Sequence, residues 1–224
     1  VLEELDGFYA RAEYAYKLSS VKPSVNASGI VSFDCGRHPL IDRKKVVPIT
    51  LSLGRDYRFL LISGPNTGGK TVTLKMVGLF CLMAMCGLFI PAKRAEVSVF
   101  REIYCDIGDS QSIEESLSTF SSHVTNIVEI VDNADKNSLV LIDELGGGTD
   151  PDEGQALAKA VVSYLLRAGG TGVVTTHYSA LKEFAFATDG IENACMEFDS
   201  DTLRPLYVIK IGLPGSSNAL AISR

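Results

Sequence analysis

Cysteine is scarce in this sequence, and its spacing points to no cross-link. The 224 residues include five cysteines, an odd number, and no two of them form a C-x-x-C pair. Neither a disulfide framework nor a structural zinc site is therefore expected. The scattered cysteines, which are Cys35, Cys81, Cys86, Cys105 and Cys195, indicate reduced thiols in a protein of the cytoplasm.

Long apolar runs are absent as well. The longest extends for 15 residues, from Met76 to Ile90, and ends at Pro91, whereas a helix that crosses a bilayer needs about 20. We therefore expect a buried helix here and no membrane partner. The start of the chain has no signal-peptide pattern, and its first residue is Val1 rather than Met, so we expect a piece excised from a longer protein.

The sequence also has no excess of basic residues. It contains 21 Lys and Arg against 27 Asp and Glu, a formal net charge of −6. A domain whose main surface grips nucleic acid usually carries a strong basic excess, so any such contact is expected to be local or made by regions outside this chain. The 46% of hydrophobic residues excludes intrinsic disorder for most of the chain.

What the sequence does contain is an alternation of short apolar runs with helical patterns, which is typical of an α/β fold with a mostly parallel sheet flanked by helices. A separate amphipathic helix is expected from Leu2 to Lys17. After Ile191, two runs separated by turn residues predict added antiparallel strands, and Gly215 opens a helix that the chain leaves at Arg224. Strands are expected at 30–33, 49–53, 58–63, 97–107, 139–143, 172–176, 195–198 and 206–211, and helices at 70–86, 119–133 and 153–167.

A glycine-rich loop lies directly between an apolar strand and an apolar helix, and it matches the phosphate-binding pattern G-x-x-x-x-G-K-[ST]. Its backbone N–H groups and the start of the helix would surround phosphate oxygens, Lys70 would reach the β- and γ-phosphates, and Thr71 would bind Mg²⁺. The alternative is a coincidental glycine-rich turn, which the strand–loop–helix setting disfavours. The nucleotide-binding loop consists of Gly64, Pro65, Asn66, Thr67, Gly68, Gly69, Lys70 and Thr71.

Two acids, Asp143 and Glu144, follow the four apolar residues of a predicted central strand. Such a strand delivers carboxylates to the carboxyl edge of the sheet, where ligands bind in α/β folds. We expect Asp143 to hold Mg²⁺ through its water shell, and Glu144 to accept a proton from the attacking water. The alternative is a solvated acidic turn that merely ends a strand.

His177 ends the next apolar strand and should emerge at the same edge as Asp143 and Glu144. A histidine at this place can donate a hydrogen bond to the γ-phosphate or to the lytic water, so we expect it to be catalytic together with Lys70 and Glu144. The other two histidines, His38 and His123, are interpreted as structural residues.

Hydroxyl residues crowd the segment 116–123, just before a predicted amphipathic helix. On sequence alone, an ordinary helix N-cap is the favoured interpretation of this segment. The other is a second phosphate-binding helix end, which would serve a partner's nucleotide if it lies on the far side of the subunit.

Taken in this order, these elements resemble the ATPase domain of the MutS family, a branch of the ABC-type P-loop ATPases. The resemblance covers residues 29–224, as a domain truncated in its last helix, and implies that 1–28 end a preceding helical core or lever region. Mismatch-repair members typically have Arg where this chain has Gly147, and Ser-Thr where it has Asp150 and Pro151. Segments 116–123 and 146–154 instead resemble the bacterial type-two MutS branch. The other matching positions are Gly36–Pro39, Gly64–Thr71, Asp143–Glu144 and Thr176–Tyr178.

The resemblance implies a homodimer with two composite ATP sites, in which Ser118 of one subunit faces the γ-phosphate bound by the other. It also implies an adenine contact just upstream of the phosphate loop, where Val46 and Val47 replace the aromatic residue of mismatch-repair relatives; we assign this apolar contact to Val47. Full-length members of the branch usually carry a C-terminal nuclease-like domain. They are associated with suppression of recombination through branched DNA and with rescue of collided ribosomes, targets that regions outside this chain would contact.

Three other readings remain. A mismatch-repair MutS fragment is disfavoured by Gly147 and by Asp150-Pro151. A nucleotide-switched binding module with little turnover is disfavoured by Glu144. A kinase acting on a small metabolite would use the same loop but leaves Ser118 and His177 without a role.

Overall fold

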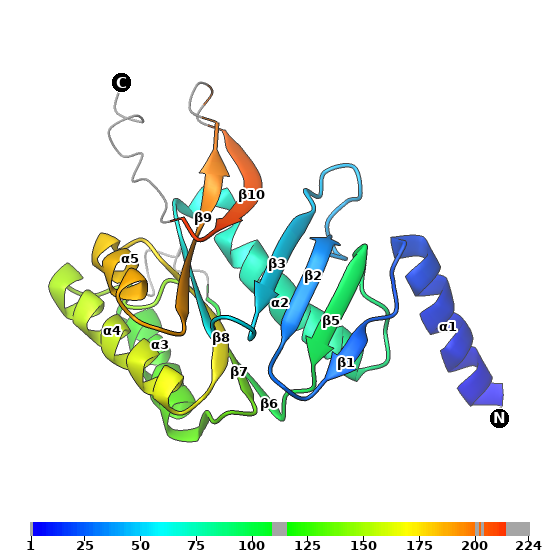
Figure 1. Cartoon of the computed structure of the whole chain (residues 1–224), viewed down its shortest axis with the longest axis horizontal. Coiled ribbons are helices and arrows are strands. Elements are labelled where there is room, and N and C mark those ends of the chain that lie inside the picture. The colour runs from blue at the N-terminus through cyan, green and yellow to red at the C-terminus, as the bar shows by residue number, and fades with distance from the viewer. Residues whose placement is uncertain (1, 109–115, 200–201, 203, 214–224) are drawn as a thin grey trace.

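The computed structural model describes residues 2–108, 116–199, 202 and 204–213, and within them the chain forms two sheets and five α-helices (Figure 1). For residues 116–120, only the backbone is described. The helix expected from Gly215 lies outside the described residues.

The larger sheet has six strands in the order β10-β9-β4-β8-β7-β6, and all neighbours are parallel except β10 and β9. This is the predicted α/β arrangement with added antiparallel strands. Because β10 and β9 are consecutive, they form the expected hairpin at one side of the sheet. The strands are β4 (Phe59–Ser63), β6 (Glu102–Asp106), β7 (Ser138–Ile142), β8 (Thr171–Thr176), β9 (Ile191–Phe198) and β10 (Pro205–Ile211).

Both faces of this sheet are covered, so its central strands β4, β8 and β7 are buried along their whole length. Along β4, Leu60 and Ile62 point into one hydrophobic core, and Phe59 and Leu61 point into the other. All five residues of β4 are buried. The period-two alternation therefore places two cores on opposite sides of one strand.

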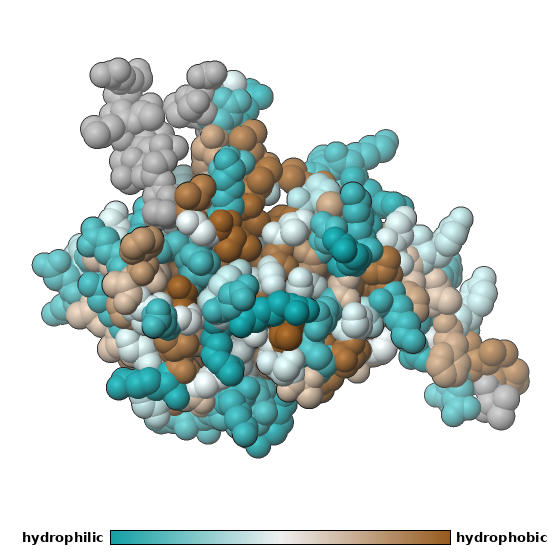
Figure 2. All heavy atoms as spheres, viewed as in Figure 1, coloured by the Kyte–Doolittle hydropathy of each residue, from teal (hydrophilic) through white to brown (hydrophobic). Residues whose placement is uncertain are grey.

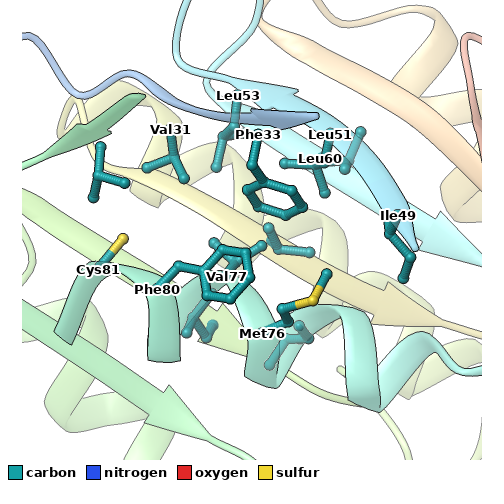
Figure 3. Packing of buried hydrophobic residues seen from close by; sticks show 14 of the residues in the cluster. Val31, Phe33, Ile49, Leu51, Leu53, Leu60, Met76, Val77, Phe80 and Cys81 are labelled. Atoms are coloured by element: carbon teal, nitrogen blue, oxygen red, sulfur yellow. The ribbon is translucent and has the colours of Figure 1, made fainter. Parts of the chain in front are cut away.

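The first core lies between the large sheet and a second sheet of four strands, with helix α2 (Lys70–Met85) between them (Figure 1). Figure 3 shows Phe80 of α2 facing Phe33 of the smaller sheet, with ring centroids 5.0 Å apart in an edge-to-face arrangement. The smaller sheet has the order β1-β5-β2-β3, formed by β1 (Ser24–Asn26), β2 (Val31–Gly36), β3 (Ile49–Leu53) and β5 (Arg94–Ser98).

The second core lies on the opposite face of the large sheet, under three helices (Figure 1). Its helical residues include Ile127 and Ile130 of α3, Val162 of α4 and Leu181 of α5. These helices are α3 (Ser116–Asn133), α4 (Pro151–Arg167) and α5 (Ser179–Phe186).

Helix α1 (Leu2–Leu18) projects away from the body of the molecule and buries none of its residues (Figure 1). Its apolar side chains include Leu2 and Leu5, which are 82% and 63% exposed. Apolar surface is visible at the projecting end of the molecule (Figure 2). The predicted helix is confirmed. Among its partly buried side chains, Tyr14 packs against the first core.

Two features differ from the sequence-based expectation. The single strand expected at 97–107 is two strands, β5 and β6, which belong to different sheets. The chain leaves β5 at Ser98 and enters β6 at Glu102, with the buried Phe100 between them anchoring the crossing in the first core. Strand β1 and helix α5 were not expected.

Candidate nucleotide site

The glycine-rich loop joins the centre of the large sheet to helix α2. After β4 the chain forms a short 3₁₀ turn at Asn66–Gly68, and Gly69 then adopts a left-handed conformation with φ of 94° before α2 begins at Lys70. Glycine adopts this conformation without steric cost. The start of α2 and the loop therefore form one continuous turn at the carboxyl edge of the sheet.

Lys70 is buried in this turn, with 1% of its surface exposed. Its ammonium group donates a hydrogen bond to the carbonyl oxygen of Gly64 at the other end of the loop. Burial lowers the pKa of Lys70, and the carboxylates of Glu144 and Asp143 partly offset that shift. The loop thus holds a desolvated cation close to two acids.

Asp143 lies directly after β7 and is 7% exposed. Its Oδ2 accepts a hydrogen bond from the Thr71 hydroxyl at 2.6 Å, and its Oδ1 accepts one from the Thr175 hydroxyl. The two residues predicted as metal ligands are therefore in contact, although 72 positions separate them in the chain. Oxygen ligands of this kind suit Mg²⁺, which keeps several waters and takes few protein ligands.

Glu144 begins a tight turn in which its own φ is +52°. Its backbone N–H donates to the Thr175 hydroxyl at 2.8 Å, so one threonine of β8 fixes both acids. The turn continues through Gly146, where a Cβ atom would lie 2.3 Å from the carbonyl oxygen of Gly154 in α4. The Tyr178 hydroxyl donates to the carbonyl oxygen of Gly146 at 2.9 Å, which ties the turn to the end of β8.

His177 follows β8 and is exposed. It lines a cavity of about 220 Å³ together with Asp143 and Glu144, so the structure brings the predicted catalytic histidine to the predicted acids. The rest of the lining comes from the end of β6, from the turn after Glu144 and from α3 and α4. A small polar molecule in this cavity would lie beside both Glu144 and His177.

A second pocket, of about 340 Å³, lies beside the glycine-rich loop and is lined by Val47, as the adenine contact predicted from the sequence requires. Two ring side chains, His38 and Tyr207, line it as well. A Cβ atom on Gly69 would lie 3.1 Å from Cδ1 of Tyr207, so the β9–β10 hairpin packs directly on the loop. Burial, with a smaller effect from Lys75, lowers the pKa of His38.

Ser118 falls in the first turns of α3, but its side chain lies outside the described residues. The helix expected at 119–133 begins three residues earlier, at Ser116, so this segment belongs to the helix itself. The partner of the Ser118 hydroxyl stays a prediction. The first described polar contact of α3 with the sheet is made by His123, whose Nδ1 donates to Oδ2 of Asp106 at 2.8 Å.

Three residues of the site were missed in the sequence. Thr175 lies inside an apolar strand, and only the pairing of β7 with β8 shows that it faces Asp143. Asp106 was assigned to the interior of one long strand, and Tyr207 comes from a strand that follows the loop by more than 130 residues. The signal for Asp106 was its position at the end of an apolar run, the same signal that identified Asp143.

Other kinds of site are not seen in the part of the chain that the structure describes. No group of three or more His, Cys, Asp or Glu side chains is placed to hold a metal ion. The site at Thr71 and Asp143 differs in type, because it combines one carboxylate with a hydroxyl. Among the same residues, no helix is long and apolar enough to span a membrane.

Comparison with known proteins agrees with this geometry. Residues 60–223 match the family model described as MutS domain V. The chain is also 56% identical over 225 aligned positions to proteins called Endonuclease MutS2 from Caldanaerobacter subterraneus subsp. tengcongensis, Clostridium acetobutylicum and Clostridium botulinum. Each alignment covers all of this chain but only 28% or 29% of the relative, so the chain spans less than a third of their length.

The family match includes Asp143, Glu144, His177 and every residue of β4 except Phe59. The relatives are of the type-two branch that the sequence resembles. The chain therefore belongs to the MutS family, as its domain V, the ATPase domain.

Proposed function

We propose that this chain binds ATP with Mg²⁺ at the glycine-rich loop and that Glu144 and His177 carry out hydrolysis. The observation that carries the proposal is the contact between Thr71 and Asp143 beside the buried Lys70. A cation, a hydroxyl and a carboxylate converge where the start of a helix meets the end of a parallel strand. That combination suits a triphosphate with its metal ion.

The phosphates would lie over the loop from Gly64 to Thr71. Lys70 would exchange its hydrogen bond with the carbonyl oxygen of Gly64 for bonds to the β- and γ-phosphate oxygens. Mg²⁺, held by Thr71 and through water by Asp143, would neutralise charge on the phosphates. Thr175 would keep Asp143 in its present orientation by continuing to donate to Oδ1.

Glu144 is the group placed to take a proton from the attacking water. Its backbone N–H is held by Thr175, and the turn that follows is held by Tyr178, so the side chain starts from a fixed point of the backbone. His177 lines the same cavity and would donate a hydrogen bond to the γ-phosphate or to the water. General-base catalysis of this kind contributes roughly 10²- to 10⁴-fold in rate.

The adenine base of ATP would occupy the second pocket, between the segment that carries Val47 and the β9–β10 hairpin. Val47 would supply an apolar contact. The rings of His38 and Tyr207 are available for stacking, an interaction that the valines alone do not provide.

The active unit in this proposal is a homodimer in which Ser118 at the start of α3 faces the partner's γ-phosphate. A helix N-terminus carries partial positive charge and free N–H groups, so a phosphate between two such ends would join the subunits. Each ATP would then contact the loop of one subunit and α3 of the other.

In the complete protein, ATP turnover would drive action on branched DNA, with suppression of recombination, or on stalled ribosomes. The relatives are called endonucleases, and most of their length lies outside the aligned region. Stimulation of ATP turnover by a four-way DNA junction, compared with collided ribosomes and with linear duplex of equal length, would identify the target.

Mixing two inactive variants of the complete protein tests the composite site. We expect Lys70→Ala and Ser118→Arg each to abolish hydrolysis. A heterodimer would carry both lesions in one site and none in the other, so an equal mixture should recover roughly a quarter of wild-type turnover when subunits exchange freely in a two-fold dimer. A mixture that stays inactive, although heterodimers are shown to form, would contradict the assignment of Ser118 to the partner's site.

A further inference from the structure

A buried carboxylate in the lining of the cavity beside Glu144 connects α3 to the large sheet. Asp106 is the last residue of β6 and is 3% exposed. Its Oδ2 accepts from Nδ1 of His123 at 2.8 Å, and its Oδ1 accepts from the side-chain amide of Asn126 at 3.1 Å. Residues three apart on a helix share one face, so both donors come from one turn of α3.

The same residue is joined to the strand that carries the catalytic acids. The backbone N–H of Asp143 donates to the carbonyl oxygen of Asp106 at 2.9 Å. Asp106 therefore holds α3 through its side chain and the end of β7 through its backbone. A carboxylate this deeply buried is stabilised only while its hydrogen-bond donors stay in place.

The fit around His123 is close. A Cβ atom on Gly108 would lie 3.2 Å from Cε1 and 3.3 Å from Nε2 of the imidazole, so the ring packs against backbone that carries no side chain. The ring is held from the other side by its bond to Asp106. This packing fixes one orientation of the imidazole, with Nδ1 as the donor because a carboxylate accepts.

His123 also comes early in α3, before the helix is held by apolar packing. Ile127 is the first buried residue in the part of α3 whose side chains are described, and Ile130 is the next. Ser118 lies five residues before His123, roughly 7 to 8 Å along a helix axis. The contact with Asp106 therefore controls the direction of the helical turns that lead to Ser118.

We propose that His123 is a positioning residue for the partner's ATP site: by donating to Asp106 it fixes the start of α3 so that Ser118 faces the γ-phosphate bound by the other subunit. This inference rests on the proposed composite site. In this inference His123 serves the ATP bound by the partner subunit, and not the ATP bound by the glycine-rich loop of its own chain.

The competing possibility is a role within the same subunit, because His123 lines the cavity that Glu144 and His177 also line. The two roles place the lesion of a His123 variant in different sites of a dimer. A mixing experiment separates them.

The test uses the complete protein and His123→Ala, which we expect to lower turnover at least tenfold while ATP affinity at its own loop stays unchanged. Mixed with Lys70→Ala, it should recover activity, because one site of the heterodimer is then intact. Mixed with Ser118→Arg, it should stay inactive, because each site then lacks one α3 contribution. The reverse pattern, with recovery only in the Ser118→Arg mixture, would place His123 in its own subunit's site and overturn the proposal.

Conservative variants separate positioning from folding. His123→Asn keeps an amide N–H near the position of Nδ1 and should retain most of the activity, whereas His123→Gln moves its amide to the position of Nε2 and should behave as His123→Ala. Asn133→Ala is the matched control on the exposed end of α3, where its amide donates only to Glu129. Equal activity of the Asn and Gln variants would overturn the proposal, and should His123→Ala fail to fold, the Gln variant takes its place in both mixtures.

The outcomes also separate this inference from the proposed function. An inactive mixture of Lys70→Ala with Ser118→Arg rejects the composite site itself. Recovery in that mixture, together with no recovery when His123→Ala or His123→Gln is mixed with Lys70→Ala, rejects only the role of His123.

Discussion

Lys70 shows how a single residue combines burial with charge in this site. Its ammonium group is almost fully buried, and burial lowers its pKa although two carboxylates lie nearby. In the protein alone, it bonds to a carbonyl oxygen of its own loop. Phosphate oxygens are stronger acceptors than a carbonyl, so a bound nucleotide would offer this buried cation a stronger hydrogen bond than the one it makes within the loop.

Replacing Lys70 with Ala should therefore weaken ATP binding by about tenfold to a hundredfold, which corresponds to a charge-assisted hydrogen bond of about 1.5 to 3 kcal/mol. Titration of the variant with ATP gives the affinity. Lys22→Ala, which removes an exposed lysine far from the loop in sequence, is the control and should bind as wild type. Unchanged affinity in Lys70→Ala would show that the loop does not bind the phosphates.

A second residue-scale prediction concerns the thiols. Cys81 is buried in α2 within the first core, and burial raises its pKa to about 12 (Figure 3). Since only the thiolate reacts, we expect iodoacetamide at pH 8.5 to modify the exposed Cys86 and to leave Cys81 unmodified until the protein unfolds. Mass spectrometry of the two peptides measures this, and equal modification of both in the folded protein would contradict the packing of α2.

At the scale of elements, the ends of the secondary structures were predicted well wherever polar or turn residues mark them. Helix α2 was expected at 70–86 and is Lys70–Met85, and α4 begins at Pro151 because Asp150 accepts from the N–H groups of Asp152 and Glu153. The separation of β5 from β6 was not predictable, because the residues between them are as apolar as the strands. Assignment to two sheets depends on pairing partners that lie 60 or more positions away in the chain for β5 and 36 positions away for β6.

The carboxyl end of α1 is held by hydrogen bonds from residues that lie far from it in the sequence. The Arg37 guanidinium donates to the carbonyl oxygens of Leu18 and Ser19, each at 3.1 Å. Arg43 donates to the carbonyl oxygen of Lys17 at 2.7 Å and to the Ser19 hydroxyl at 2.8 Å. Cations at this end of a helix satisfy its free carbonyls and interact favourably with its dipole.

Arg37→Ala combined with Arg43→Ala should therefore lower the free energy of opening the last turn of α1 by about 1 kcal/mol. Amide exchange there should become roughly fivefold faster. Hydrogen exchange followed by mass spectrometry of the peptide over residues 12–20 measures the change. Lys44→Ala, which removes an exposed charge from the same loop, is the matched control and should leave exchange unchanged. The same exchange rate in both variants would show that the arginines do not hold the helix.

At the scale of the whole molecule, the two sheets contribute to different parts of the site. The large sheet brings Asp143, Glu144 and His177 to one edge, as the order of apolar runs predicted. The smaller sheet and the β9–β10 hairpin enclose the second pocket, and this enclosure was not visible in the sequence because Val47 and Tyr207 meet only after both sheets form. Motifs predict the residues that would touch phosphate, whereas the residues that would touch the adenine base depend on tertiary packing.

The hydrolytic role of Glu144 is the central claim, and one measurement tests it most directly. ATP binding and phosphate release are measured on the same samples of wild type and Glu144→Gln, with Asp152→Asn as a control at an exposed acid nearby. We expect Glu144→Gln to bind ATP as wild type but to slow phosphate release by about a hundredfold or more, because it loses the general base. Equal rates of phosphate release by wild type and Glu144→Gln would contradict the account and favour a nucleotide-switched module instead.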